Sequence, residues 1–116
     1  MLTVEQQDDL VTVNVMGELM LDDFREFEAV VVGELEDYER IDVLLDLSNM
    51  TGFSIDAAWE DLKFTREHER DFRRIAVVTS DQWLTWLVWL NGAFSGAQVQ
   101  SFPERQDAEH WLAMQE

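Results

Sequence analysis

The sequence predicts an α/β fold: a mixed, mostly parallel five-stranded sheet that starts with an antiparallel hairpin and carries four helices. Segments with a period of two residues, typical of strands, alternate along the chain with segments of period three to four, typical of helices. Only a tight turn separates the first two strand-like segments, which therefore predict a hairpin. Helices separate all the later strands, and such crossovers favour parallel pairing.

The expected hairpin joins a strand at residues 2–6 to a strand at residues 10–16 through a turn at residues 7–9. In the second strand apolar and polar residues alternate, so one face should be buried and the other should be polar. Gly17 is expected to end this strand. The apolar face consists of Val11, Val13 and Val15.

An amphipathic helix is expected over residues 22–38, because apolar residues recur there in steps of three and four. Its buried stripe is expected to consist of Phe24, Phe27, Val31, Leu35 and Tyr38. Its solvent side is expected to carry Asp23, Glu26, Glu34, Glu36 and Asp37.

The rest of the chain continues to alternate between strands and helices. The first apolar run after the helix is typical of a strand buried on both faces. Pro103 precedes the last helix, where the N–H that proline lacks would be unpaired in any case. The expected elements are a strand at residues 41–47, a helix at 54–71, a strand at 75–78, a helix at 82–94, a strand at 99–102 and a helix at 104–114.

The chain has 25 acidic residues against eight basic ones, a formal net charge of −17. This balance excludes nucleic acid as a partner, because a phosphate backbone needs a basic footprint. It also argues against an anionic membrane held by charge alone. The basic residues gather at the back of the second helix, where we expect pairing with neighbouring acids; an anion site beside His68 is the alternative. They are Lys63, Arg66, Arg70, Arg73 and Arg74.

A chain of 116 residues is expected to form a single domain over residues 1–116. It has no cysteine, which excludes disulfides, a thiolate nucleophile and cysteine-based metal sites. The two histidines lack metal-site spacing, and no nucleotide-binding motif is present, so neither metal nor cofactor is expected. Because no leader peptide or membrane span is expected either, we expect a cytoplasmic protein.

The segment from Trp83 to Phe94 is apolar nearly all round, whereas a helix that covers a sheet should be apolar on one face only. One stripe can face the sheet, and something else must cover the remainder. Another helix of the same domain is one alternative, and a homodimer or other protein interface is a second, because tryptophan is enriched at interfaces. A membrane surface or an apolar ligand is the third.

Taken together, the order of elements and several short motifs resemble the STAS domain superfamily, and within it the SpoIIAA-like branch. The resemblance covers nearly the whole chain. The motifs include Gly17-Glu18-Leu19 before the first helix, Asp46-Leu47-Ser48-Asn49-Met50 closing the third strand, Asp61-Leu62-Lys63-Phe64, Arg74-Ile75-Ala76-Val77-Val78, Asp81-Gln82-Trp83 and Trp111-Leu112.

The resemblance implies a domain without catalytic activity, similar in shape to lipid-carrying sandwich folds, that holds a hydrophobic ligand or touches membranes. STAS anti-sigma-factor antagonists carry a phosphorylatable serine in an Asp-Ser-Ser-Gly motif at the start of the second helix. This chain reads Thr51-Gly52-Phe53-Ser54 there, and Ser54 is the nearest hydroxyl.

We therefore expect a non-enzymatic domain that binds an apolar or lipid-like ligand, a membrane surface or a protein partner. The alternative is a partner-switching regulator, similar to anti-sigma-factor antagonists, that is controlled by phosphorylation at Ser54 at a helix N-terminus. A hydrolase that uses His68 beside Glu60 or Asp61 is a third interpretation. The expected binding residues are Trp59, Trp83, Trp86, Trp89 and Phe94.

Overall fold

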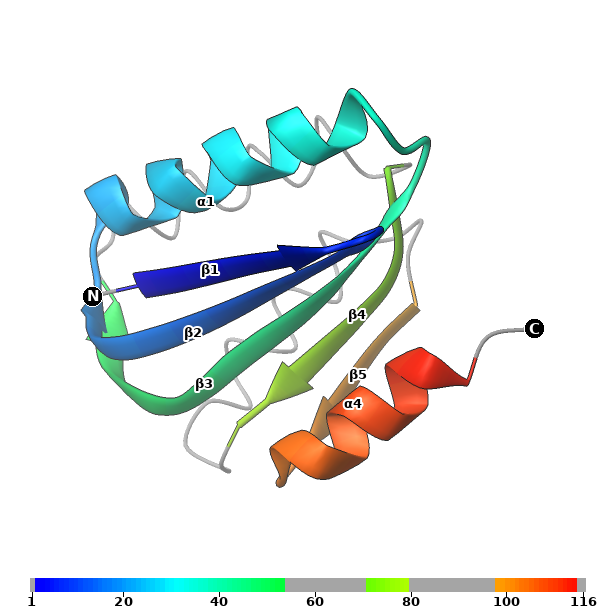
Figure 1. Ribbon diagram of the computed structural model, residues 1–116. Helices are drawn as coiled ribbons and strands as arrows, with labels where there is room; N and C mark the ends of the chain where they lie inside the picture. The colour runs from blue at the N-terminus through cyan, green and yellow to red at the C-terminus, as the bar shows by residue number, and fades with distance from the viewer. Residues whose placement is uncertain (1, 54–70, 80–97, 115–116) are drawn as a thin grey trace.

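Five strands form one sheet in the spatial order β1-β2-β3-β4-β5 (Figure 1). The structure is a computed structural model that describes residues 2–53, 71–79 and 98–114. β1 pairs antiparallel with β2, and the three other neighbouring pairs are parallel, which confirms the predicted mixed sheet. The strands are β1 (Leu2–Gln7), β2 (Leu10–Leu19), β3 (Ile41–Phe53), β4 (Phe72–Val78) and β5 (Gln98–Phe102).

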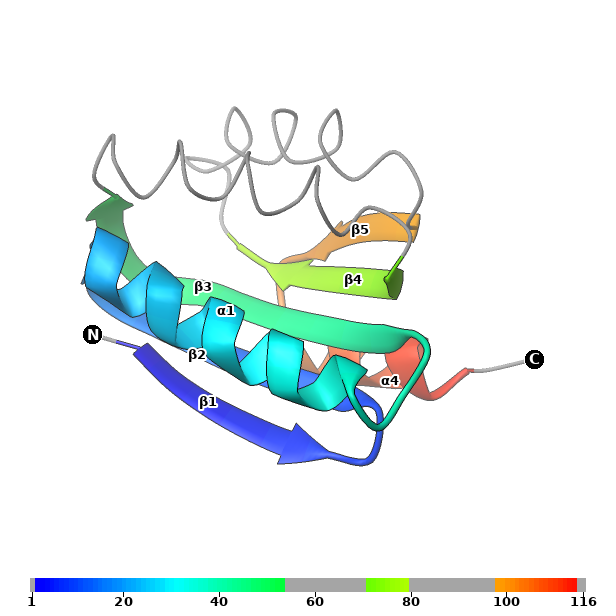
Figure 2. The same cartoon turned by 90° about the horizontal axis from the view of Figure 1, so that it is seen from above.

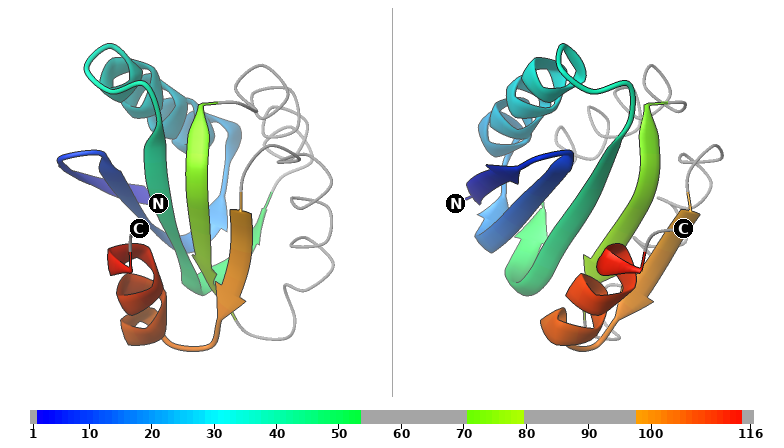
Figure 3. Two further views of the ribbon diagram at one scale, coloured as in Figure 1. Left: turned by 90° about the vertical axis from the view of Figure 1, so that its right-hand side faces the viewer. Right: turned by 45° about the vertical axis from the view of Figure 1, so that its right-hand side comes forward.

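Two helices lie on opposite faces of this sheet (Figure 2). Helix α1 (Leu21–Leu35) contacts β1 and β2, whereas α4 (Arg105–Ala113) contacts β3, β4 and β5 (Figure 3). The two other expected helices, at residues 54–71 and 82–94, lie outside the described residues. Within the described ranges, no helix is long and apolar enough to cross a membrane.

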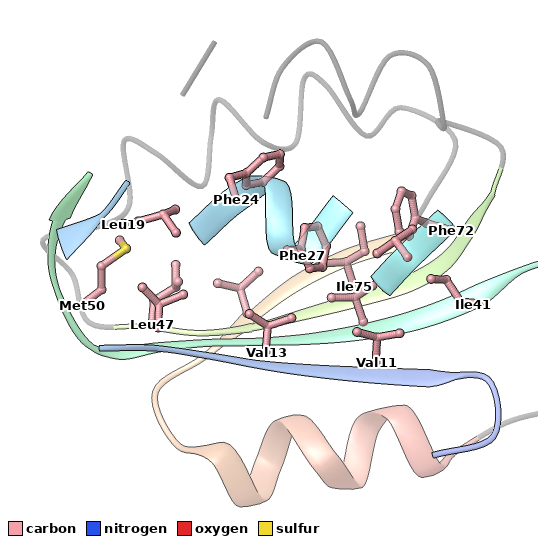
Figure 4. Packing of buried hydrophobic residues seen from close by; sticks show 14 residues of the cluster. Val11, Val13, Leu19, Phe24, Phe27, Ile41, Leu47, Met50, Phe72 and Ile75 are labelled. Carbon is pink, nitrogen blue, oxygen red and sulfur yellow. The ribbon is translucent and has the colours of Figure 1, made fainter. Parts of the chain in front are cut away.

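Each face of the sheet has its own buried cluster. On the α1 side the predicted valine face packs against the phenylalanines of the helix (Figure 4). On the other side Leu44 and Val78 pack against Ala108 and Leu112 of α4. Full burial of a valine or leucine contributes roughly 1.5–3 kcal/mol relative to exposure, so the two clusters hold both helices on the sheet. The valine face is formed by Val11, Val13 and Val15.

The turn between β1 and β2 contains two residues, Asp8 and Asp9, because Gln7 and Leu10 are already paired. Asp8 has φ 54°, in the left-handed region, which a short polar side chain tolerates better than most others do. The predicted hairpin is confirmed, and its turn presents two carboxylates at one end of the sheet.

The prediction that Gly17 ends β2 is wrong. The prediction that the third strand ends at residue 47, within the motif at residues 46–50, is also wrong. β2 and β3 continue as a pair to Leu19 and Phe53. Their register shifts twice, and Gly17 adopts φ +72° at the second shift. Glycine adopts this conformation at no steric cost. The pairing of β2 with β3 therefore changes register at Gly17 and continues beyond it.

The predicted solvent side of α1 is wrong for Glu34. Glu34 is buried, with 9% of its surface exposed, and it continues the stripe of Phe24, Phe27 and Val31 in steps of three and four. The predicted members at the end of the stripe lie less deep: Leu35 is half-buried, and Tyr38 is exposed beyond the helix. The reason is the 3.6-residue period, which carries the buried stripe from Val31 to position 34.

Candidate functional site

Two buried carboxylates, Asp42 and Asp46, lie on β3 at positions of the same parity as Leu44. Side chains alternate between the two faces of a strand, so all three point to the side that α4 covers. Asp42 is 2% exposed and Asp46 is 9% exposed. A buried carboxylate is costly unless ion pairs and hydrogen bonds satisfy it. The partners of these two groups therefore determine what this face of the sheet can do.

Asp42 forms a bidentate ion pair with Arg73 of β4. Arg73 donates from Nε to Asp42 Oδ1 and from Nη2 to Asp42 Oδ2, both at 3.1 Å. The same Nη2 also donates to Asp9 Oδ2 at 2.6 Å, and the backbone N–H of Arg74 donates to Asp42 Oδ1 at 3.2 Å. The hydrogen bonds to Asp42 and then to Asp9 raise the pKa of Arg73. Arg73 thus links Asp9 of the β1–β2 turn to Asp42 on the central strand β3.

Asp46 stabilises the first register shift between β2 and β3. Asn14 pairs with Asp46, but Met16 pairs with Asn49, so β3 contains one extra residue. Asp46 Oδ1 accepts hydrogen bonds from the backbone N–H of Ser48 at 3.0 Å and from its Oγ at 2.5 Å. The carboxylate thereby supplies a partner to an N–H at the point where the ladder is disrupted.

Arg105 connects this bulge to the first turn of α4. Its Nη1 donates to Asn14 Oδ1 at 2.6 Å and to Asp46 Oδ2 at 3.4 Å, and its Nε lies 3.6 Å from Glu109 Oε2. The beginning of α4 is therefore held over β2 and β3 by one guanidinium.

Arg74 holds the other end of α4. Its Nη1 donates to the carbonyl oxygens of Trp111 at 3.2 Å and of Met114 at 2.5 Å. A cation is favourable at a helix C-terminus, where the last carbonyls lack helical partners. The guanidinium also lies 5.4 Å from the centre of the Trp111 ring, whose centre lies 5.6 Å from that of Phe102 with the two ring planes tilted by 48°.

The prediction that Arg73 and Arg74 belong to the basic end of the second helix is wrong. Both lie on β4, and they pair with residues distant in sequence and not with neighbouring helical acids. Strand pairing starts at Phe72, three residues earlier than predicted. Most of the other basic residues of this group, and His68, lie outside the described residues.

Methionine side chains are exposed where the carboxyl end of β2 leads into α1. Met16 is 37% exposed and Met20 is 47% exposed. Ser48 and Asn49 of β3 are exposed in the same region, since Met16 pairs with Asn49. We call Met16, Met20, Ser48 and Asn49 the carboxyl-end patch. These four residues are uncharged, but acidic residues adjoin them: Glu18, between the two methionines in sequence, is exposed, and the Met20 N–H donates to Asp23 Oδ2.

The binding and phosphorylation residues predicted from sequence all lie outside the described residues, so the structure tests none of them. The chain continues into Ser54 directly from Phe53, which pairs with Leu19 beside the carboxyl-end patch. In the described parts of the chain, no three histidine, aspartate or glutamate side chains are grouped as metal ligands. The predicted residues are Ser54, Trp59, Trp83, Trp86, Trp89 and Phe94.

Sequence reasoning missed the two Asp–Arg networks. The signal was present, because Asp42 and Asp46 interrupt an otherwise apolar strand at positions of equal parity. Acids at such positions need buried partners. Their arginines, however, come from residues 73 and 105, a pairing that only the folded chain reveals.

The sequence profile of the SpoIIAA-like family matches residues 10–113. No match was found among curated proteins. Several solved structures are similar to the chain. One, an uncharacterised protein of the DUF3478 family with a SpoIIAA-like fold from Shewanella loihica PV-4, is 24% identical, with a TM-score of 0.76. That comparison covers 97% of this chain and 92% of the other.

Two further structures share the fold at lower identity. The anti-sigma factor antagonist SpoIIAA in its unphosphorylated form is 10% identical, with 99% and 100% of the two chains covered and a TM-score of 0.69. An anti-sigma factor antagonist from Mycobacterium paratuberculosis is 16% identical, with 97% and 93% covered and a TM-score of 0.60. The family match covers four of the five strands, β2 to β5, together with α1 and α4, and the chain belongs to the SpoIIAA-like family.

Proposed function

We propose that this chain is a non-enzymatic, cytoplasmic binding domain that contacts a protein partner through the carboxyl-end patch and the tryptophan-rich segment. The observation that carries the proposal is the exposure of Met16 and Met20, two large apolar side chains, where β2 leads into α1. Methionine is common at binding surfaces because its flexible, polarisable side chain adapts to different partners.

The buried carboxylates support a binding role over an acid–base role. Both oxygens of Asp42 and both oxygens of Asp46 accept hydrogen bonds from groups that hold the β1–β2 turn, the bulge at Ser48 and the start of α4. Their positions make them components of the scaffold. The solved anti-sigma factor antagonists, which share the fold, are named for acting against another protein, and this favours a protein as the partner.

The tryptophan-rich segment enters the proposal on the strength of its sequence alone. The segment from Trp83 to Phe94 contains no charged residue, so electrostatic repulsion from a chain of charge −17 is weakest there. An apolar or lipid-like ligand, a membrane surface and a second copy of the chain are the competing occupants. Native mass spectrometry, vesicle co-sedimentation and sedimentation velocity distinguish them from a protein partner.

Phosphorylation at Ser54 is a second candidate function. One of the similar structures is SpoIIAA of Bacillus in the phosphorylated form, 10% identical with a TM-score of 0.66. Ser54 directly follows the strand end that borders the carboxyl-end patch, so a phosphate there would place negative charge beside this patch. The Ser54→Asp variant should then weaken partner binding, and unchanged binding would exclude this control.

The main proposal is tested by co-precipitation with the double variant Met16→Ser, Met20→Ser. Met114→Ser is the matched control, because Met114 is 54% exposed at the far end of α4. We expect the double variant to lose partners that the wild type and the control retain. Equal recovery of the same proteins by all three chains would refute binding through the carboxyl-end patch.

A further inference from the structure

A pocket of about 270 Å³ opens where the β1–β2 turn meets the last turns of α4. Its apolar wall includes Leu10, Leu44 and Leu112. The pocket lies at the opposite end of the sheet from the carboxyl-end patch, because Leu10 is the first residue of β2. This volume is many times what a single water molecule needs, and it suits a small organic ligand.

Carboxylates from three elements line this pocket. Arg73 pairs with Asp9 and Asp42, and Arg105 lies 3.6 Å from Glu109. No ion pair joins Asp8 to any residue that the structure describes. Arg74 donates to the C-terminal carbonyls of α4, so this helix end adds no uncompensated negative charge. Acids therefore exceed bases around the pocket, and the local potential favours a cation.

The negative potential extends to the other face of the sheet. Burial raises the pKa of Glu34, and the charges of Asp37, Asp9 and Asp8 raise it further. Glu34 Oε2 is buried and has no hydrogen-bond partner within residues 2–53, 71–79 and 98–114. The turn carboxylates thus act on a side chain that does not line the pocket.

Thr12 is the second polar feature of the pocket. It lines the pocket, and it is 9% exposed on the face covered by α4. Among the described residues, its hydroxyl makes no hydrogen bond. This hydroxyl is therefore available to a ligand N–H that enters the pocket.

We propose that this pocket binds a small aliphatic amine. The ammonium group lies between the Asp8 carboxylate and the Thr12 hydroxyl, which accept its hydrogen bonds, and the methylene groups pack on the leucine wall. Charge alone would favour any cation, but the apolar wall selects one with a short hydrocarbon chain. This site is independent of the carboxyl-end patch and of the tryptophan-rich segment.

The test is an NMR titration of the full chain with butylamine at low ionic strength, observing the amides of Thr12, Leu44 and Leu112. Asp8→Asn removes the charge while asparagine tolerates the positive φ. Glu26→Gln, an exposed position on α1, removes an equal charge far from the pocket. We expect Asp8→Asn to weaken binding about fivefold or more, Thr12→Val also to weaken it, and Glu26→Gln to leave it unchanged.

The neutral analogue 1-butanol separates charge from shape. Shifts of the same size with 1-butanol would overturn the proposal, because the pocket would then be an apolar hole with no preference for ammonium. Equal weakening by Asp8→Asn and Glu26→Gln would overturn it too, because the amine would then be a counterion of the acidic surface. Shifts confined to the pocket and lost in Asp8→Asn support it.

Discussion

Removing Arg73 should destabilise the fold more than removing any exposed arginine. The substitution Arg73→Met keeps an unbranched side chain but deletes the two hydrogen bonds to Asp42 and the one to Asp9. It leaves the carboxylate of Asp42, 2% exposed, without its guanidinium partner. Breaking a fully buried ion pair in this way costs about 3–5 kcal/mol.

The expected cost here is smaller because the Arg73 side chain is 37% exposed. Solvent screens part of the interaction, so we expect about 2–3 kcal/mol. With a denaturant slope near 1.5–2 kcal/mol/M, the midpoint of urea unfolding should fall by roughly 1–2 M. Arg25→Met, exposed on α1, removes the same charge from an already acidic chain and is the control for net repulsion.

A double-mutant cycle isolates the pair itself. Asp42→Asn combined with Arg73→Met should cost less than the sum of the two single substitutions, by about 1 kcal/mol or more, because the double variant buries no unpaired charge. Additive costs, or a midpoint for Arg73→Met equal to that of Arg25→Met, would refute the role assigned to this network.

Three further predictions concern other positions. Gly17→Ala should lower stability by about 1 kcal/mol in thermal unfolding, because φ +72° is strained for alanine although no atom lies within 4 Å of the added Cβ. Glu34→Gln should stabilise the fold at neutral pH, because the folded pKa of Glu34 is raised and its charged form is disfavoured; this advantage should shrink as the pH falls towards the ordinary carboxyl value of 4.5. Arg74→Gln should speed hydrogen exchange in the last turn of α4, since the carbonyls of Trp111 and Met114 lose their donor; unchanged exchange would contradict the capping role.

The sheet was predictable from sequence because its signals are local. Alternating valines identify β2, and a short apolar run identifies β3. The ends of these strands were not predictable. A glycine often marks the end of a strand, but here a register shift accommodates Gly17 and β2 remains paired with β3 beyond it. That shift depends on a pairing partner, and periodicity within one segment carries no information about partners.

The polar networks were not predictable for a related reason. A composition with 25 acids makes any single aspartate look like a surface residue. Asp42 differs only because Arg73, 31 residues away, lies on the neighbouring strand. Glu34 shows the same limit, since its burial follows from where α1 lies on the sheet. The tryptophan and Ser54 assignments stay predictions.

Binding at the carboxyl-end patch is tested most directly by site-specific photo-crosslinking. A photoreactive residue placed at position 20, which is 47% exposed, should give a discrete protein adduct in an extract of the source cells. The same residue at position 114, 54% exposed at the opposite end of the molecule, should not give that adduct. No protein adduct at position 20, or the same adduct at both positions, would contradict a partner surface at the carboxyl end of the sheet.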